Sequence, residues 1–203
     1  MIEVVPLRDL CDPSEGISAG PSWSRLKSTT LGSSGVPVVK PAALTMDGRI
    51  LREGLDRFPD QEAIGLERFR LAWGDIVTVR QGSLGRQAVV GEDEDGWLFG
   101  PACLRIRLRE DSPVMPEYLV HFLGRAETRD WLYAQASGQT VPTLTERRLG
   151  TLPVLVPPLS AQRHLFHQVA EVDEQVRRHE RALGLLAELR GSLIERTVTR
   201  PRP

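Results

Sequence analysis

The sequence is poor in lysine, in cysteine and in long apolar runs, and each shortage excludes a class of protein. Only Lys27 and Lys40 among the 26 basic residues are lysines, so almost all positive charge is guanidinium. Cys11 and Cys103 stand far apart and form no CxxC pair, which suits reduced thiols better than a disulfide framework. No window approaches the roughly 18 apolar residues that cross a bilayer, and residues 1–10 lack the pattern of a signal peptide. We therefore expect a folded, soluble protein of the cytoplasm with no membrane partner.

Motifs for the common DNA-modifying and nucleotide-hydrolysing chemistries are also missing. A phosphate-binding GxxxxGK[ST] loop is absent, since Leu26 and Val39 precede the two lysines. A restriction-type nuclease site commonly has an acidic residue two positions before a lysine, and neither lysine has one. The only Pro-Pro pair lies in "VPPL" and lacks the Asp or Asn and the aromatic residue of an amino-methyltransferase clamp. We expect no catalytic residue in this chain.

Two segments carry a weak pattern for metal binding. His164 and His167 are three residues apart on an expected helix, but no third ligand is evident. The acidic stretch 92–96 lacks the alternating oxygen ligands of a calcium loop and is more typical of a polar turn. We expect no metal site.

The formal net charge of −1 is unlike that of a strongly basic protein that binds nucleic acid through salt-dependent contacts alone. The preference for arginine nevertheless favours nucleic acid, because a guanidinium pairs bidentately with guanine edges and phosphates. A high-GC codon bias would give the same preference, so both explanations stay open at this point.

The chain is expected to be an α+β protein, with a mixed globular domain over residues 1–158 and a long helix over 159–199. The β-branched run 35–41 predicts a buried strand, and 74–91 predicts two strands joined by a tight glycine turn. In 98–110, Leu104, Ile106 and Leu108 alternate with arginines, which places Arg105, Arg107 and Arg109 on one face of a strand. The helical spacing in 116–137 predicts one helix, and 151–157 predicts an edge strand.

A heptad pattern follows the prolines at 157 and 158, where Ser160 is the expected N-cap. Seven apolar residues occupy nine positions of the repeat, His179 and Arg190 being the exceptions. Such a stripe cannot be buried by one helix, so the pattern predicts a coiled coil with a partner helix. The expected seam is Leu165, Val169, Val172, Val176, Leu183, Leu186 and Leu193.

The stretch "RQGSLGRQ" is the most promising candidate for recognition. Its glycines allow a backbone to approach a ligand closely, and arginine and glutamine are the side chains that pair bidentately with guanine and adenine. An ordinary hairpin with polar side chains is the alternative.

Six segments in order resemble one family, the DNA specificity subunits of type I restriction-modification enzymes. They are "VPLRDLCDPSEGIS", "GVPVVKPAALTMDGRI", "GDIVTVRQGSLGRQAVV", "PEYLVHFL", "SGQTVPTLTERRLGTLPVLVPPLSAQRHL" and the terminal heptads. The similarity covers nearly the whole chain and is weakest over 51–71. It implies a target-recognition domain followed by a conserved helix that measures distance. A loop at 138–140 and a capping box between Thr143 and Glu146 are expected at their junction.

The resemblance implies a noncatalytic subunit for phage defence that reads double-stranded DNA in company with a methyltransferase subunit. No cofactor is expected in this chain, since S-adenosylmethionine belongs to the methyltransferase; a restriction endonuclease subunit is a further partner left open. Family members usually carry two recognition domains and two helices, whereas this chain has one of each. A homodimer would restore the arrangement and would read a bipartite, palindromic target. The expected DNA contacts are Lys40, Arg80, Gln81, Ser83, Arg86, Gln139 and Thr140.

Two other functions remain as alternatives. A coiled-coil homodimeric adaptor would bind another protein with its globular domain and would be indifferent to DNA sequence. An independent hydrolase is disfavoured by the missing motifs, and activity of the purified chain alone would support it.

Overall fold

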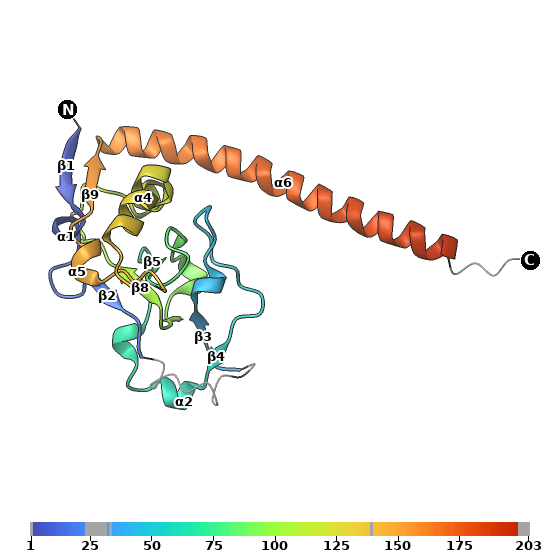
Figure 1. Cartoon of the computed structure of the whole chain (residues 1–203), viewed down its shortest axis with the longest axis horizontal. Coiled ribbons are helices and arrows are strands. Elements are labelled where there is room, and N and C mark those ends of the chain that lie inside the picture. Colours follow the sequence, from blue (N-terminus) through green and yellow to red (C-terminus); the bar gives the residue numbers. More distant parts are fainter. Residues whose placement is uncertain (1, 23–31, 33, 139, 199–203) are drawn as a thin grey trace, which may run out of the picture. The chain divides into compact units, whose positions relative to one another are not determined.

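The structure, a computed structural model, describes residues 2–22, 32, 34–138 and 140–198. The chain divides into two compact units, Met1–Gln162 and Arg163–Pro203. The first unit contains short strands and helices, and the second contains most of the long helix α6 (Leu159–Val198), drawn in orange and red in Figure 1. The expected α+β class, with a mixed globular domain and a long C-terminal helix, is confirmed.

A four-stranded antiparallel sheet forms the centre of the globular unit. Its order is β2 (Ile17–Ala19), β8 (Cys103–Ile106), β5 (Ile76–Val79) and β6 (Gln87–Val89). In the register, Val77 of β5 lies opposite Ala88 on one side and Arg105 on the other. The two strands expected within 74–91 are confirmed. Their connection spans residues 80–86, so it is a longer loop than the tight turn that the glycines predict.

A smaller three-stranded sheet adjoins this one, with the order β4 (Arg57–Phe58), β3 (Val36–Val39) and β7 (Leu98–Phe99). Strand β3 confirms the strand expected within 35–41; it is antiparallel to β4 and parallel to β7. Short helical turns complete this part of the unit: η1 (Pro41–Ala43), α2 (Asp60–Ala63), η2 (Glu67–Phe69) and η3 (Glu92–Glu94). Helix α1 (Leu7–Leu10) lies elsewhere, directly after β1 (Glu3–Pro6), and its Leu7 amide donates to the Leu152 carbonyl at 2.9 Å.

Both faces of the central sheet are covered by apolar side chains. Ile76 belongs to one hydrophobic cluster, with Leu104 and Ile106, whereas the next residue, Val77, belongs to a second cluster with Phe99. Because successive side chains of a strand point to opposite faces, the sheet separates two cores. Each fully buried large side chain contributes about 1.5–3 kcal/mol, so β5 is held from both faces.

The segment expected to be one helix over 116–137 is two helices. Helix α3 (Pro116–Gly124) ends before Arg125, whose ψ of 147° is extended, and α4 (Ala126–Gln135) follows. A Cβ at Gly124 would lie 3.0 Å from Nε2 of Gln87 on β6. Glycine permits this close approach and is a poor helix former, so tertiary packing breaks the helical pattern here.

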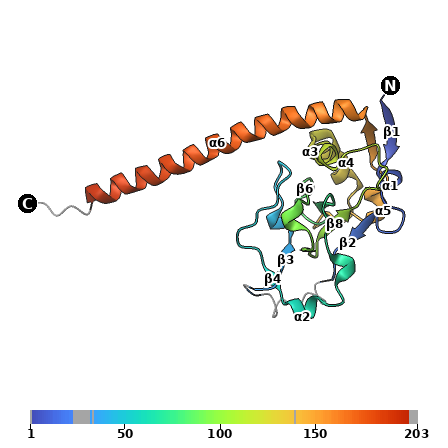
Figure 2. The same ribbon diagram turned by 180° about the vertical axis from the view of Figure 1, so that it is seen from behind.

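A two-stranded ribbon joins the beginning of the chain to the end of the globular unit. Strands β1 (Glu3–Pro6) and β9 (Pro153–Val156) pair antiparallel, and they lie side by side in Figures 1 and 2. The strand expected over 151–157 is therefore confirmed, although its partner was not foreseen.

The helix before this ribbon is capped differently from the expectation. The cap of α5 (Glu146–Leu149) is Thr145, whose side chain accepts a hydrogen bond from the Arg148 amide at 3.3 Å. Thr143 instead pairs with Ser137, and the Glu146 carboxylate accepts from the Ala19 amide at 2.7 Å. The expected capping box between Thr143 and Glu146 is wrong because both residues have other partners.

Helix α6 begins at Leu159, so Ser160 lies in the first turn and is not its N-cap. The first turn belongs to the globular unit because Gln162, which is fully buried, connects three backbone groups. Its Nε2 donates to the carbonyls of Pro113 and Pro157 at 2.8 Å each, and its Oε1 accepts from the Met115 amide at 2.9 Å. In the described part of the chain, no helix has the length and apolar character needed to span a bilayer.

Candidate nucleic-acid interface

Two loops that are distant in sequence are joined where β5 ends. Gln81 and Thr143 form an isolated antiparallel bridge, and Thr143 also bridges to Ser137. The Gly82 amide donates to the Pro142 carbonyl at 3.0 Å, and the Leu144 amide donates to the Arg80 carbonyl at 2.8 Å. We call loops 80–86 and 137–143 together the paired loops. Their mutual backbone bonds fix one loop relative to the other.

Most of the expected DNA contacts lie on the paired loops. Gln81, Ser83 and Thr140 are exposed, and Arg80 and Arg86 are half-buried. Gln139 lies outside the described residues. Polar side chains that can pair with base edges therefore belong to two loops whose backbones are joined to each other.

The arginines of the paired loops differ from most other arginines of the globular unit in lacking an acidic partner. Within the described residues, Arg80 and Arg86 form no ion pair, and Nε of Arg80 is buried without a hydrogen-bond partner. By contrast, Arg49 pairs with Asp47 at 2.6 Å. Guanidinium charge on this surface is consequently available to an anionic ligand.

Lys40 occupies a different environment from the other expected contacts. It follows β3 and forms an ion pair with Asp56, and its side chain is only 22% exposed. Its alkyl chain approaches Gly100, while the Ala102 carbonyl accepts from the Arg80 amide at 2.8 Å. The turn at 100–102 thus lies between Lys40 and the paired loops, and a carboxylate already neutralises the lysine.

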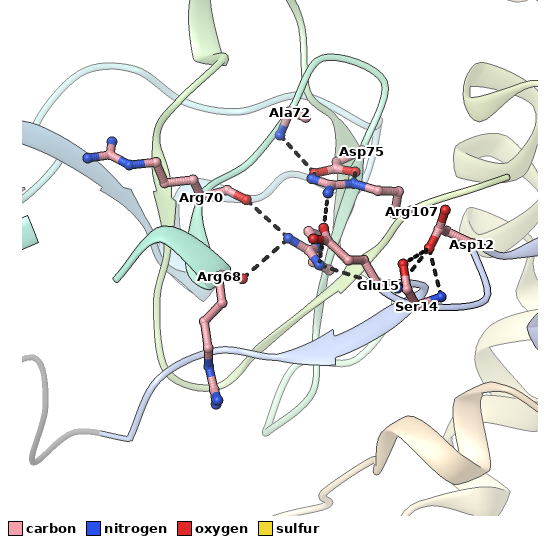
Figure 3. Close-up of polar contacts among 9 residues, drawn as sticks. Asp12, Ser14, Glu15, Arg68, Arg70, Ala72, Asp75 and Arg107 are labelled. Carbon is pink, nitrogen blue, oxygen red and sulfur yellow. Dashed lines mark hydrogen bonds and ion pairs between the residues drawn. The ribbon is translucent and has the colours of Figure 1, made fainter. Parts of the chain in front are cut away.

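A charged cluster holds the other end of β5. Asp75, which is 2% exposed, receives two hydrogen bonds from the Arg107 guanidinium at 2.8 Å each. Arg107 also pairs with Glu15, and Figure 3 shows these three side chains pointing toward one another. The Arg105 guanidinium is buried and donates to the backbone carbonyls of three residues, Glu15, Arg68 and Arg70.

Two of the three arginines expected on one strand face, Arg105 and Arg107, therefore bind other groups of the protein and have a structural role. Burial, with repulsion from Arg107, lowers the pKa of Arg105, whereas the hydrogen bonds that Arg107 donates to the Asp75 carboxylate raise the pKa of Arg107. Both stay charged, because the ordinary pKa of arginine lies far above neutrality. The cluster joins loop 11–16 to the sheet and so fixes β5, whose far end leads into the paired loops.

The heptad stripe of α6 is exposed in the single chain. Leu183 is 66% exposed, and Val172 and Leu186 are similarly open. Leu165, Val176 and Leu193 are exposed as well, and Val169 is partly so. Leu185 and Leu189 add further exposed apolar surface on the same helix, outside the seam. Apolar surface of this extent on a helix is typical of a site for another protein segment.

No group of three or more metal-ligating side chains occurs among the described residues, where His164 and His167 have no third ligand. The two thiols are not nucleophile candidates, since Cys11 and Cys103 are both buried. Burial raises the pKa of each to about 12.

Comparison with solved structures identifies the fold. The chain is similar to the HsdS subunit from Thermoanaerobacter tengcongensis, with 21% identity and a TM-score of 0.64 over 100% of this chain and 51% of that one. It is also similar to the S subunit of a type I restriction-modification system from M. genitalium, with 13% identity and a TM-score of 0.62 over 95% and 44%. A third match, from a study of complex assembly and conformational transition of the type I R-M system, has 18% identity and a TM-score of 0.61 over 93% and 43%.

These likenesses show that the chain has the fold of type I specificity subunits and spans about half the length of the structures it matches. No family model matches the sequence, and no curated protein matches it either.

Proposed function

We propose that the chain is a noncatalytic DNA specificity subunit of a type I restriction-modification system. The observation that carries this proposal is the likeness of nearly the whole chain, globular unit and helix together, to specificity subunits. The paired loops support it independently, because Arg80 and Arg86 on them have no acidic partner within the part of the chain that the structure describes.

In the proposed mechanism the paired loops enter the major groove of duplex DNA. Gln81 suits adenine, which accepts and donates to a side-chain amide, and Arg80 and Arg86 suit guanine. Ser83 and Thr140 can donate to bases or to phosphates. Lys40 remains a candidate phosphate contact, although it also forms an ion pair with Asp56. A bidentate pair contributes about 1–3 kcal/mol of discrimination against a wrong base.

Methyl transfer belongs to a separate subunit in this proposal. That methyltransferase would hold S-adenosylmethionine and would supply much of the phosphate affinity that a chain of net charge −1 lacks. The exposed leucines outside the seam, Leu185 and Leu189, are suitable for contact with such a subunit.

Helix α6 provides the spacing between two recognition domains. Its 40 residues extend about 60 Å at about 1.5 Å per residue. Two chains that bury their seams against each other form a twofold dimer with two identical readers. The target is then bipartite and palindromic, with a nonspecific spacer set by the helices.

Co-purification with the methyltransferase encoded beside this chain, followed by genome-wide mapping of methylated sites, tests the proposal. We expect a stable complex and one bipartite, palindromic methylated motif. A motif that stays the same after residues 80–86 are replaced would contradict DNA reading by this chain.

A protein-binding adaptor is the second candidate, and the exposure of Trp73 favours it. Trp73 is 70% exposed, and its amide is fixed by a hydrogen bond to Asp95 at 3.0 Å. A rigidly held, exposed tryptophan is a frequent anchor of protein interfaces. If the chain is an adaptor, its binding must be independent of DNA sequence, both with and without the methyltransferase. The same preparation can be used to measure binding to different DNA sequences.

A further inference from the structure

Arg129 of α4 lies across the paired loops at Gly85. A Cβ added at Gly85 would stand 2.5 Å from Cδ and 2.6 Å from Cγ of Arg129, and Gly85 has a φ of +89°. The alkyl chain of Arg129 therefore occupies the space that any side chain at position 85 would need. This contact connects a helix, which is a rigid support, to the loop expected to read bases.

The guanidinium of Arg129 has no partner within the described part of the chain, since it forms no ion pair and no side-chain hydrogen bond there. Arg125, one turn earlier, pairs with Glu127 at 3.3 Å. The difference matters because a half-buried guanidinium without a carboxylate keeps its full charge for a ligand. Arg80, Arg86 and Arg129 are thus three arginines on or beside the loop at Gly85 that have no acidic partner among the described residues.

The position of Arg129 distinguishes its role from that of the loop residues. Gln81 and Ser83 are exposed and belong to the part of the loop before Gly85, whereas Arg129 reaches the loop from the side, at its return toward β6. When the loop enters the groove, a group beside the loop contacts the edge of the groove, where the phosphates lie.

We infer that Arg129 and Arg86 form a phosphodiester-binding subsite beside the base-reading loop. This inference rests on the proposed function and adds a residue to it. Arg129 fixes the depth and register of the loop on the duplex and carries no base information.

The test measures duplex binding by the complex of this chain with its methyltransferase as a function of salt concentration. Arg129→Gln retains most of the alkyl chain that packs on Gly85 and removes the charge, while Arg129→Lys keeps the charge. Arg125→Gln is the matched control on the same segment. We expect Arg129→Gln to lower affinity about 5- to 10-fold at low salt and to reduce the slope of log K against log salt by about 0.9, the value for one lost phosphate contact.

The loss must be equal on the mapped target and on its single-base variants, and Arg129→Lys must restore the slope. An unchanged slope in Arg129→Gln overturns the inference, as does a loss confined to certain base pairs, which would make Arg129 a base reader. Thermal unfolding of each variant separates lost folding from lost contact. If the wild-type complex shows no preference for any sequence, the proposed function fails, whereas a wild-type preference with an unchanged Arg129→Gln slope removes only the subsite.

Discussion

Gln81 and Thr143, which are far apart in the sequence, face each other across a single antiparallel bridge. Backbone hydrogen bonds on both sides of this bridge join the two loops, so neither loop can shift without the other. A candidate reader built from two loops is thereby held as one surface, and substitutions within it should change specificity while leaving the fold intact.

Arg80→Ala and Arg86→Ala should separate base contacts from phosphate contacts. The variant that removes a bidentate base contact should lose about 1–3 kcal/mol on the target and relax one base position. The variant that removes a phosphate contact should weaken all sequences alike. Binding to a set of single-base target variants measures both patterns. If neither variant alters affinity or preference, loop 80–86 is not the reader.

Gln162→Ala should loosen the first turn of α6 from the globular unit. The substitution leaves the Met115 amide and the half-buried carbonyls of Pro113 and Pro157 without their partner, at a cost of about 1–3 kcal/mol. Urea unfolding followed by circular dichroism measures the loss. Gln168→Ala, an exposed position on the same helix, is the control and should change stability by less than about 0.5 kcal/mol. Equal effects at both positions would refute the anchoring role.

Arg107→Met should destabilise the fold by about 3 kcal/mol because Asp75 then stays buried without its cation. Adding Asp75→Asn should recover part of this loss, since the amide carries no charge. Arg49→Met removes a comparable pair that is exposed on both sides and should cost less than about 1 kcal/mol. Chemical denaturation of these proteins and of Asp75→Asn alone checks the order, and an additive double variant would contradict the coupling.

Leu186→Asp should prevent self-association, because a carboxylate in the middle of an apolar seam cannot be buried without a partner. Ser192→Asp adds the same charge on the opposite face of the helix and should leave association unchanged. Sedimentation velocity over a range of concentrations distinguishes the two. A wild-type chain that remains monomeric even with its methyltransferase would exclude the dimer.

Alkaline pH should weaken the fold through Cys103. Its pKa is raised to about 12 by burial, from an ordinary value of 9.0. Between these values the unfolded chain loses the thiol proton and the folded chain keeps it, so the free energy of unfolding falls as pH rises. From pH 8 to pH 10 the fall attributable to this thiol is about 1.4 kcal/mol. Denaturation of the wild type and Cys103→Ala at both pH values measures it; the variant should lose less than the wild type.

The features predictable from the sequence are those that depend on neighbouring residues. Strand β3, the β5–β6 pair and the helix α6 follow from β-branched runs, glycines and heptads, and all three are present. The fold likeness also agrees with the resemblance found from six segments. Local patterns record local preferences, so these elements need no knowledge of distant contacts.

The features that could not be predicted depend on contacts between distant residues. The helix over 116–137 breaks because Gly124 packs on Gln87, and the capping residue is Thr145 because Thr143 is occupied by Ser137. The alternation of arginines with apolar residues predicted the strand face of Arg105 correctly. It did not predict that Arg105 is buried, because its partner Glu15 is 90 residues away in the sequence.

Other features went unnoticed for the same reason. Nothing local distinguishes Gln162 from an exposed glutamine of the same helix. The sequence predicts backbone freedom at Gly85, whereas the contact of Gly85 with Arg129 depends on the fold.

The ribbon of β1 and β9 brings residues 3–6 beside residues 153–156. The polypeptide thus enters and leaves the globular unit at one place. Under the proposed function, replacement of the segment between these two strands would give a new target sequence while the ribbon and the start of α6 stay the same.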